Sequence, residues 1–338
     1  MKKIVVIGAG AAGAKAASKA KSLDKTNIVE LYTKDDKISV SLCGLPYFIE
    51  GSVEDINKLI IKTPEDFNKK EIPVFLNHNL EEINPNKNYV VINGAHIFYD
   101  ELILATGAEV NIPNIENINA GGIYTFRSIE SALLIKEKMK EAKTVLLIGA
   151  GYIALELTEA FVKNGLKVII VEKNNRILSD FDEEFSEILQ NYIKDNFEGK
   201  IETYFNEQVA KINVDENNNF KSVLIQSENE ITADFCILCT GAKPNVEIAR
   251  KSGIKLGITG AIYVDNKMRT NFENIFACGD CAEKYDKITH QAVYIGLGTI
   301  ANKEGRVSAI NATGVDKENF EGILSSTITR FFDYTISK

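Results

Sequence analysis

Hydrophobic positions repeat one pattern in two parts of the chain. Residues 3–8 form a short apolar run that ends in glycine, and an Ala- and Lys-rich helical stretch and a second apolar run at residues 28–32 follow. Residues 144–149, 152–164 and 167–171 show the same order of apolar run, helical stretch and apolar run. Continuous apolar runs are typical of parallel strands buried on both faces. The pattern therefore predicts two βαβ units in one chain.

The remaining segments predict further strands and one long helix. Short strands separated by Asn-rich turns are expected within residues 73–92 and at 97–104. In the second half we expect strands near residues 201–205, 209–214, 223–226, 235–238, 261–264 and 274–277, a helix at about 291–311, and a final strand at 327–338. This order predicts an α/β fold with two Rossmann-like dinucleotide-binding domains.

Composition narrows the classes of function. The chain has 338 residues, 45% of them hydrophobic, and a formal net charge of -8. This length predicts two or three domains, and the acidic balance without a basic run argues against nucleic acid or a membrane as partner. No apolar run is long enough to span a bilayer and no signal peptide is recognised, so a cytoplasmic location is expected. The 5 cysteines are too few for a disulfide framework, and no metal site is expected.

Gly8, Gly10 and Gly13 lie between the first predicted strand and its helix. Glycines at this spacing allow a tight turn, let the backbone approach a pyrophosphate and permit close packing of helix on strand. Because strand and helix are both in place, the turn predicts a dinucleotide site. An acid that binds the ribose is expected at the end of the next strand, but Glu30 lies within that strand and not at its end.

A second glycine turn contains Gly149 and Gly151. Glu172 ends the second strand of this unit, where a carboxylate accepts a hydrogen bond from a ribose 2′-hydroxyl and repels a 2′-phosphate. This favours NADH over NADPH. A strand-end acid that merely faces solvent is the alternative interpretation, and the nearby Lys173 and Arg176 leave NADPH as a second option.

Cys43 precedes a predicted helix that begins near residues 44–46. A thiol at a helix N-terminus has a lowered pKa, because the helix dipole and the exposed N–H groups stabilise the thiolate. A single cysteine is also a common buried packing residue. The spacing around Cys43 leaves both interpretations open.

Six motifs are spread over nearly the whole chain, at residues 38–47, 105–107, 149–156, 240–245, 277–280 and 301–306. Together they resemble the pyridine nucleotide–disulfide oxidoreductases, specifically the single-cysteine branch of coenzyme A-disulfide reductases, NADH-dependent persulfide and polysulfide reductases, NADH oxidases and NADH peroxidases. The resemblance implies a glutathione-reductase-like architecture, with an FAD-binding domain at residues 1–110 and 244–320, an NAD-binding domain at 111–243, and the start of a truncated C-terminal dimerisation domain at 321–338. A homodimer is expected for the full-length protein.

The resemblance also implies roles for individual residues. For FAD it implies Gly8, Gly10, Gly13, Thr106, Gly107, Gly279 and Asp280, of which Asp280 would hold the ribityl chain. For the nicotinamide nucleotide it implies Gly149, Gly151, Tyr152, Glu156, Glu172 and Gly241. Tyr152 would cover the nicotinamide pocket, Glu156 would approach the contact between flavin and nicotinamide, and Ser39 would contact substrate. The cysteines with CxxC spacing, Cys236 with Cys239 and Cys278 with Cys281, are interpreted as structural.

Departures from the family's patterns bear on the reaction. Two-cysteine members carry a second cysteine at the position of Phe48, so Cys43 must cycle through a mixed disulfide, a persulfide or a sulfenic acid. Oxidases and peroxidases usually have a histidine in the first glycine turn, where this chain has Ala11 and Ala12, and the difference favours a sulfur substrate. Coenzyme A-disulfide reductases often carry Asn directly before the cysteine, and Leu42 takes that place here, so coenzyme A stays one option among several.

The expected function is that of an FAD-dependent NAD(P)H oxidoreductase that reduces a small disulfide, persulfide or polysulfide, with Cys43 as the catalytic residue. One alternative is an NADH oxidase or peroxidase that reduces oxygen or peroxide through a cysteine sulfenic acid. Another is a flavin-binding sensor without turnover, which the short C-terminus would favour if it is natural.

Overall fold

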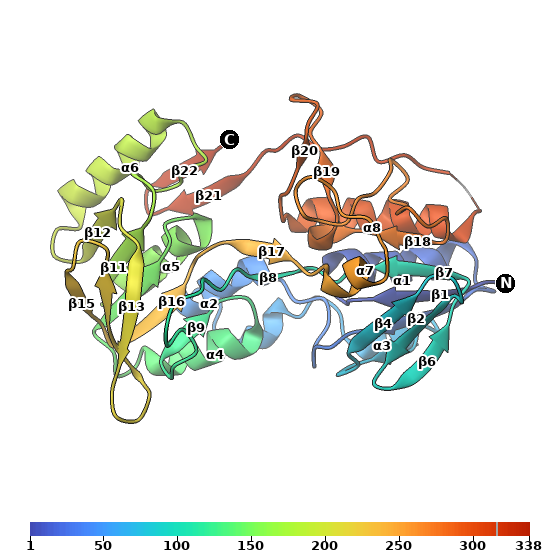
Figure 1. Cartoon of the computed structure of the whole chain (residues 1–338), viewed down its shortest axis with the longest axis horizontal. Coiled ribbons are helices and arrows are strands. Elements are labelled where there is room, and N and C mark those ends of the chain that lie inside the picture. The colour runs from blue at the N-terminus through green and yellow to red at the C-terminus, as the bar shows by residue number, and fades with distance from the viewer. Residues whose placement is uncertain (316) are drawn as a thin grey trace. The chain divides into compact units, whose positions relative to one another are not determined.

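The computed structural model describes residues 1–315 and 317–338, and Figure 1 shows the course of the chain. The chain folds into two compact units. The first comprises Met1–Ser41, Ile60–Glu109 and Pro244–Ser325, and the second comprises Leu42–Leu59, Val110–Lys243 and Ser326–Lys338. Residues 42–59, which the sequence analysis places in the FAD-binding domain, belong to the second unit because their helix packs on two helices of that unit.

The core of the first unit is a parallel five-stranded sheet in the order β18-β7-β1-β2-β3. Its strands are β1 (Lys3–Ile7), β2 (Ile28–Tyr32), β3 (Val74–Phe75), β7 (Glu101–Leu104) and β18 (Ile275–Ala277). In register, Ile4 lies opposite Val29 on one side and Glu101 on the other. Most residues of β1 and β7 are apolar and buried, as expected for central strands that are covered on both faces.

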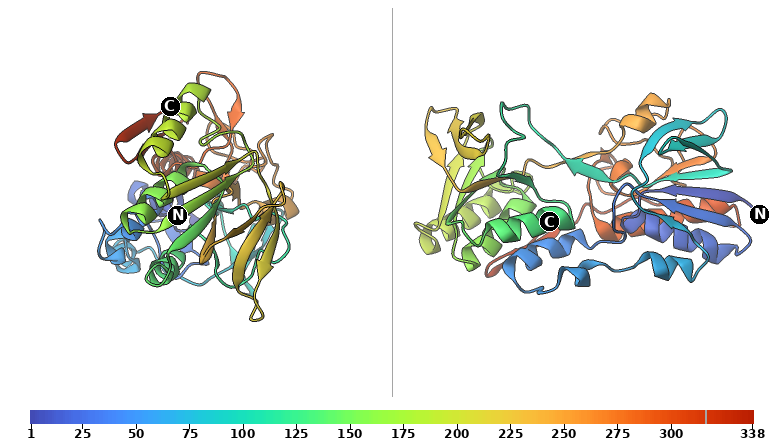
Figure 2. Two further views of the ribbon diagram at one scale, coloured as in Figure 1. Left: turned by 90° about the vertical axis from the view of Figure 1, so that its left-hand side faces the viewer. Right: turned by 90° about the horizontal axis from the view of Figure 1, so that it is seen from below.

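Different layers cover the two faces of this sheet, as Figure 2 shows. The helices α1 (Ala11–Leu23) and α8 (Gly298–Thr313) pack together on one face, and an antiparallel sheet of β4 (Leu80–Asn84), β5 (Tyr89–Ile92) and β6 (Ala95–Phe98) lies on the other. Gly305 permits the close approach of α8, because a Cβ atom there would lie 2.2 Å from the carbonyl oxygen of Ala12. The smaller elements are α3 (Pro64–Asn68), α7 (Glu247–Lys251), η3 (Gly279–Cys281), β19 (Lys284–Tyr285) and β20 (Ala292–Val293).

The second unit is built around another parallel five-stranded sheet, in the order β12-β11-β10-β16-β9. Its strands are β9 (Ile123–Thr125), β10 (Thr144–Ile148), β11 (Lys167–Glu172), β12 (Ile201–Phe205) and β16 (Phe235–Leu238). An antiparallel sheet of β13 (Val209–Val214), β14 (Phe220–Ile225) and β15 (Glu230–Thr232) shares one hydrophobic core with it. Leu146, Ile169 and Val223 belong to this core.

Helices and a terminal hairpin complete the second unit. They are η1 (Leu42–Gly44), α2 (Leu45–Glu50), η2 (Ile56–Leu59), α4 (Ile129–Lys138), α5 (Tyr152–Lys163), α6 (Glu183–Asn196), β21 (Ile328–Phe331) and β22 (Tyr334–Ser337). α2 packs on α5 and α4, and β21 packs along α5. β8 (Ala108–Val110) and β17 (Ala242–Pro244) form a separate two-stranded ribbon.

The predicted last helix is wrong in its first part. Residues 291–311 were expected to be helical, but α8 begins at Gly298, and β20 occupies part of the preceding segment. Gly296 and Gly298 disfavour helix before this point, because glycine loses the most backbone freedom in a helix. No helix in the described part of the chain is long and apolar enough to cross a membrane.

Two predicted strands also differ from the structure. Residues 261–264 form no strand, and Ile262 instead makes isolated bridges with Leu256 and Ala282. The strand expected at residues 327–338 is the hairpin of β21 and β22. The chain reverses between these strands at Phe332, whose φ of 49° is left-handed.

Candidate functional site

The first glycine turn joins β1 to α1 at the carboxyl edge of the first sheet. Gly8 has a φ of +98°, and a Cβ atom there would lie 2.0 Å from the carbonyl oxygen of Ala105. A Cβ atom on Gly13 would lie 1.8 Å from the carbonyl oxygen of Gly8, whereas one on Gly10 would meet no atom of the described residues within 4 Å. The turn is therefore tightly packed at Gly8 and Gly13 and open beside Gly10, where α1 begins without a side-chain cap from Gly10. The first N–H groups of a helix have no partner within the helix and can bind an anion.

Thr106 and Gly107 follow β7, which is the neighbour of β1. Thr106 donates its hydroxyl to the carbonyl of Asn245 at 2.8 Å, and the Asn245 amide donates to the carbonyl of Thr106 at 2.9 Å. Gly107 has a φ of +69°, and a Cβ atom there would meet nothing within 4 Å in the described residues. Hydrogen bonds therefore hold the loop after β7 at Thr106, and open space lies beside Gly107 among the described residues.

Gly279 and Asp280 follow β18, the other neighbour of β7. Gly279 has a φ of +79°, and a Cβ atom there would lie 2.8 Å from the Cβ of Ala12 in the first turn of α1. A Cβ atom on Gly296 would lie 3.0 Å from Oδ2 of Asp280, so this carboxylate lies beside the loop that leads into α8. The structure brings the residues that the family resemblance implies for FAD together at the ends of β1, β7 and β18.

Glu30 and Ser39 of the first unit were considered in the sequence analysis for the ribose contact and for a substrate contact. The carboxylate of Glu30 accepts a hydrogen bond from the hydroxyl of Tyr32 at 2.9 Å. It also forms an ion pair with Lys3 at 3.0 Å. Burial and this carboxylate raise the pKa of Tyr32. Ser39 lies beside the first glycine turn, where its N–H donates to the carbonyl of Ala9 at 2.8 Å.

The second glycine turn, after β10, repeats the features of the first. Gly149 has a φ of +105°, and a Cβ atom there would lie 2.4 Å from the carbonyl oxygen of Cys239. A Cβ atom on Gly151 would meet nothing within 4 Å among the residues that the structure describes. Gly241, after β16, has a φ of +84°, and its carbonyl accepts the N–H of Asn111 at 2.9 Å.

Glu172 at the end of β11 is held against this second turn. Its Oε2 accepts the N–H of Ala150 at 2.7 Å, and its Oε1 accepts the N–H of Asn174 at 2.8 Å. Only 8% of the residue is exposed. The interpretation of Glu172 as an acid in open solvent is therefore wrong, because its carboxylate is oriented by two backbone groups.

One side of α5, which carries Tyr152 and Glu156, meets the terminal hairpin. The hydroxyl of Tyr152 donates to Asp180 at 3.1 Å and shares a hydrogen bond of 2.8 Å with the hydroxyl of Thr327. Thr329 on β21 donates to Oε1 of Glu156 at 3.2 Å. Burial raises the pKa of Glu156, and this hydrogen bond opposes the shift. No local pattern predicts these contacts, because the partners lie far apart in the sequence.

Glu159, one turn further along α5, is the centre of a polar network. It accepts ion pairs from Arg330 at 3.1 Å and from Lys163 at 2.6 Å, and a hydrogen bond from the N–H of Phe332 at 2.7 Å. Lys163 also pairs with Glu50 of α2 at 2.5 Å. Burial raises the pKa of Glu159, but the hydrogen bonds from Lys163, Phe332 and Arg330 outweigh it and lower the pKa.

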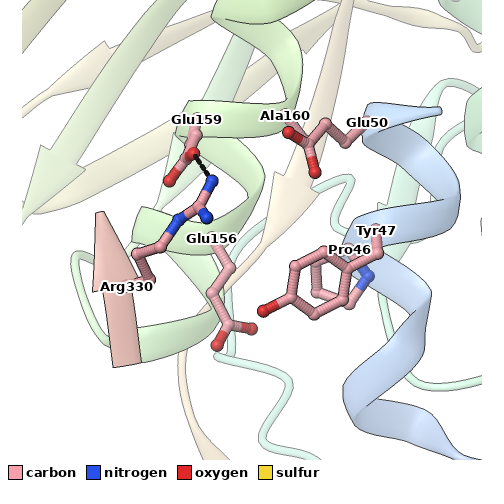
Figure 3. A pocket seen from close by; sticks show the side chains of 7 residues that line it. All are labelled: Pro46, Tyr47, Glu50, Glu156, Glu159, Ala160 and Arg330. Atoms are coloured by element: carbon pink, nitrogen blue, oxygen red, sulfur yellow. Dashed lines mark hydrogen bonds and ion pairs between the residues drawn. The ribbon is translucent and has the colours of Figure 1, made fainter. Parts of the chain in front are cut away.

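A small cavity lies within the second unit where α2, α5 and β21 meet (Figure 3). It is lined by Pro46, Tyr47, Glu50, Glu156, Glu159, Ala160 and Arg330. Tyr47 from α2 and Glu156 from α5 point toward one another across it, while Arg330 turns toward Glu159. The cavity is thus bordered by two carboxylates of one helix and by the helix that follows Cys43.

Cys43 lies in η1, directly before α2, and its side chain is exposed. The interpretation of Cys43 as a buried packing residue is therefore wrong. α2 has only 6 residues, so its dipole is smaller than that of a long helix. Phe48, at the position of a second family cysteine, is buried, and the ammonium group of Lys136 lies 5.7 Å from its ring centre.

The carboxyl end of α2 is tied to α5 and α4 by side-chain donors. The amide of Asn164 donates to the carbonyls of Ile49 at 3.3 Å and Glu50 at 3.1 Å. The ammonium group of Lys136 donates to the carbonyl of Ile49 at 2.5 Å. These bonds satisfy carbonyls that a helix end leaves unpaired, and they fix the segment that begins with Cys43.

The other cysteines differ from Cys43. Cys236, Cys278 and Cys281 are buried and Cys239 is half-buried, and burial raises the pKa of each of these four thiols. Cys281 donates weakly to the carbonyl of Cys278 at 3.3 Å. No group of three or more metal-binding side chains occurs in residues 1–315 and 317–338.

Comparison with known proteins places this geometry in a family. The pyridine nucleotide-disulphide oxidoreductase family matches residues 2–305. A protein of Pyrococcus horikoshii named NAD(P)H coenzyme A polysulfide/persulfide reductase is 36% identical over 344 residues, which cover 100% of this chain and 75% of the relative. A protein of Methanocaldococcus jannaschii named NADH oxidase is 33% identical over 341 residues, which cover 98% of this chain and 74% of the relative.

A solved structure agrees with these relatives. The NAD-dependent persulfide reductase from A. fulgidus superposes with a TM-score of 0.92 and 35% identity. The match covers 98% of this chain and 62% of that chain, so this sequence spans about three fifths of the protein it resembles. The likeness therefore extends over both units described above.

Proposed function

The chain belongs to the pyridine nucleotide-disulphide oxidoreductase family, and on that premise we propose that it is an FAD-dependent NAD(P)H oxidoreductase that reduces a small disulfide, persulfide or polysulfide. The observation that carries the proposal is the exposed thiol of Cys43, together with a buried Phe48 where a second cysteine would stand. A thiol without an adjacent resolving thiol must form its covalent intermediate with the substrate.

The first unit fits FAD. Its first glycine turn is packed tightly inside and open outside, and the loops after β7 and β18 contribute further glycines with left-handed φ. The residues that would hold the cofactor are Gly8, Gly10, Gly13, Thr106, Gly107, Gly279 and Asp280. Bound FAD would supply two-electron chemistry between a nicotinamide and sulfur. The N–H groups at the start of α1 would bind its pyrophosphate, and Asp280 would orient its ribityl hydroxyls.

The second unit fits a nicotinamide dinucleotide. Gly151 leaves open space at the start of α5, and Glu172 is oriented beside the same turn. An oriented carboxylate at a strand end accepts the ribose 2′-hydroxyl of NADH and repels the 2′-phosphate of NADPH. Tyr152 and Gly241 flank this site, and Glu156 lies one turn along α5. We therefore propose NADH as the preferred nucleotide.

Cys43 carries the sulfur chemistry. Its thiolate attacks one sulfur of the substrate disulfide, so that a bond forms between the Cys43 sulfur and that sulfur while the second sulfur leaves as a thiolate. Two electrons, which NADH supplies, break the mixed disulfide and return Cys43 to the thiolate. With one proton taken from solvent, each turnover consumes one NADH and one disulfide and yields two thiols.

An NADH oxidase or peroxidase is the second candidate, because an exposed thiol also reacts with peroxide to a sulfenic acid. Steady-state NADH consumption with coenzyme A disulfide, polysulfide, oxygen and peroxide as acceptors separates the two. We expect a sulfur acceptor to give the highest kcat/KM. A higher value for oxygen or peroxide would replace the proposal by the second candidate.

A further inference from the structure

Two opposite charges are buried together in the first unit. Lys284 of β19 and Glu304 of α8 have side chains with 0% exposure, and Nζ of Lys284 lies 3.6 Å from Oε2 of Glu304. Burial of an ion pair removes both charges from water, and the attraction between them offsets that cost only when further hydrogen bonds complete the pair. The partners of these two side chains therefore indicate what the pair does.

Both charges bind the same peptide segment. Oε2 of Glu304 accepts the N–H of Gly279 at 2.7 Å. Nζ of Lys284 donates to the carbonyl of Gly279 at 2.8 Å and to that of Ala282 at 2.9 Å. Both the N–H and the carbonyl of Gly279 are therefore hydrogen-bonded to the pair. The next residue in the chain is Asp280.

The same glycine is also fixed sterically. Its φ of +79° is left-handed, and a Cβ atom there would lie 2.8 Å from the Cβ of Ala12. Glu304 is followed in α8 by Gly305, where a Cβ atom would lie 2.2 Å from the carbonyl oxygen of Ala12. The pair therefore ties the turn after β18 to the first turn of α1, which starts at the first glycine turn.

Burying Lys284 and Glu304 together costs more free energy than a pair kept only for stability would be expected to cost. Oε1 of Glu304 is buried and has no hydrogen-bond partner in the described part of the chain. Burial raises the pKa of Glu304 to about 7, although the charge of Lys284 and the N–H of Gly279 lower it. Two apolar side chains of similar volume would fill this space without burying charge, so stability does not account for the pair.

We propose that Lys284 and Glu304 are positioning residues for the flavin, which hold the turn of Gly279 and Asp280 in the geometry that binds it. The inference rests on the proposed function, because it takes the first unit to bind FAD. Neither residue needs to touch the cofactor. Asp280 makes the contact, and the pair fixes its backbone.

The test is the affinity of the apoprotein for FAD, measured by quenching of flavin fluorescence in wild type, Glu304→Gln and Lys284→Met. Lys303→Gln is the matched control, since Lys303 is the exposed neighbour of Glu304 on the same helix. We expect the Kd for FAD to rise roughly tenfold or more in both buried variants, since each loses a charged hydrogen bond or leaves one charge unpaired. The control should bind as the wild type does.

The pH dependence separates positioning from a general loss of stability. Glu304 faces Lys284 from β19, Asp280 from η3, and Cys278 after β18. The ionised carboxylate is the stronger acceptor for the N–H of Gly279, so FAD should bind more tightly as the pH rises through about 7. In Glu304→Gln the Kd should not depend on pH in this range. A role in stability alone would change the melting temperature of the apoprotein and leave the pH profile of the Kd as in wild type.

The double variant Lys284→Met/Glu304→Gln removes both charges, so no unpaired charge is left buried. It therefore allows the measurement even if a single variant fails to fold. We expect it to bind FAD about as weakly as the weaker single variant, since both side chains act on one peptide. Affinity within threefold of Lys303→Gln, with the wild-type pH profile, would overturn the inference. A wild type that takes up no FAD would overturn the proposed function itself, and the inference with it.

Discussion

The carboxylate of Glu172 accepts the N–H of Ala150 at 2.7 Å. Ala150 is the central residue of the second glycine turn, and Glu172 is the last residue of β11. The hydrogen bond joins the turn that would bind a pyrophosphate to the acid that would bind the adjacent ribose. Both recognition elements are therefore fixed before a nucleotide binds, which lowers the ordering cost of binding.

The first prediction concerns nucleotide choice. Glu172→Gln keeps the shape of the side chain and removes the charge that repels a 2′-phosphate. We expect the ratio of kcat/KM for NADH to that for NADPH to fall by roughly tenfold, the equivalent of about 1.4 kcal/mol. Glu202→Gln on β12, whose carboxylate pairs with Lys167, is the control and should leave the ratio unchanged. An unaltered ratio in Glu172→Gln would remove Glu172 from nucleotide recognition.

The second prediction compares Glu156 and Glu159 on α5, whose contributions to folding stability change with pH in opposite directions. Burial raises the pKa of Glu156, so its contribution to stability is full at low pH and is lost as the pH rises above its unfolded value of about 4.5. Glu159 has a lowered pKa, so its contribution is present at neutral pH and is lost as the pH falls.

Thermal unfolding between pH 4 and pH 7 tests this pair. The melting temperature of Glu156→Gln, relative to wild type, should rise as the pH increases. That of Glu159→Gln should fall over the same interval. Parallel pH profiles for the two variants would contradict the described environments of these carboxylates.

The third prediction concerns the anchoring of α2. Asn164→Ala removes hydrogen bonds to the carbonyls of Ile49 and Glu50, and should lower the free energy of unfolding by about 1–2 kcal/mol. Asn196→Ala is a matched control, because Asn196 is exposed and its amide donates to the carbonyl of Tyr192 in its own helix. Urea unfolding measures both. Equal effects would mean that Asn164 does not hold the segment that follows Cys43.

The fourth prediction is that one thiol of the native protein reacts much faster than the rest. Cys43 is exposed, whereas Cys236, Cys278 and Cys281 are buried, Cys239 is half-buried, and the pKa of each of these four thiols is raised. Brief treatment with iodoacetamide followed by peptide mass spectrometry should locate the modification at Cys43. Modification of Cys278 or Cys281 at a similar rate would contradict their interpretation as structural.

The central strands and both glycine turns could be predicted because each is encoded locally. β1 and β10 are apolar after their first residue, and the glycines that follow them allow the positive φ and the close backbone approach that these turns need. The start of the last helix was predicted less accurately. Gly298 begins α8 several residues later than the hydrophobic pattern suggested, because glycine weakens the start of a helix.

The contacts that refine the site could not be predicted, because they join residues without a shared local pattern. Thr329 reaches Glu156 from a hairpin that the sequence suggested was a single strand. Lys284 and Glu304 each look like an ordinary surface charge in the sequence, and only the folded structure shows that both are buried. Charged residues are rarely fully buried, so a sequence pattern places them at the surface by default.

The most direct test of the central claim is an anaerobic titration with NADH, followed by flavin absorbance, in wild type and Cys43→Ser. NADH should reduce the flavin of both proteins, because the residues proposed to hold NADH and FAD do not include Cys43. A disulfide or polysulfide added afterwards should reoxidise the wild type quickly and Cys43→Ser at least roughly a hundredfold more slowly. Equal rates of reoxidation in the two proteins would contradict the assignment of Cys43 as the residue that passes electrons to sulfur.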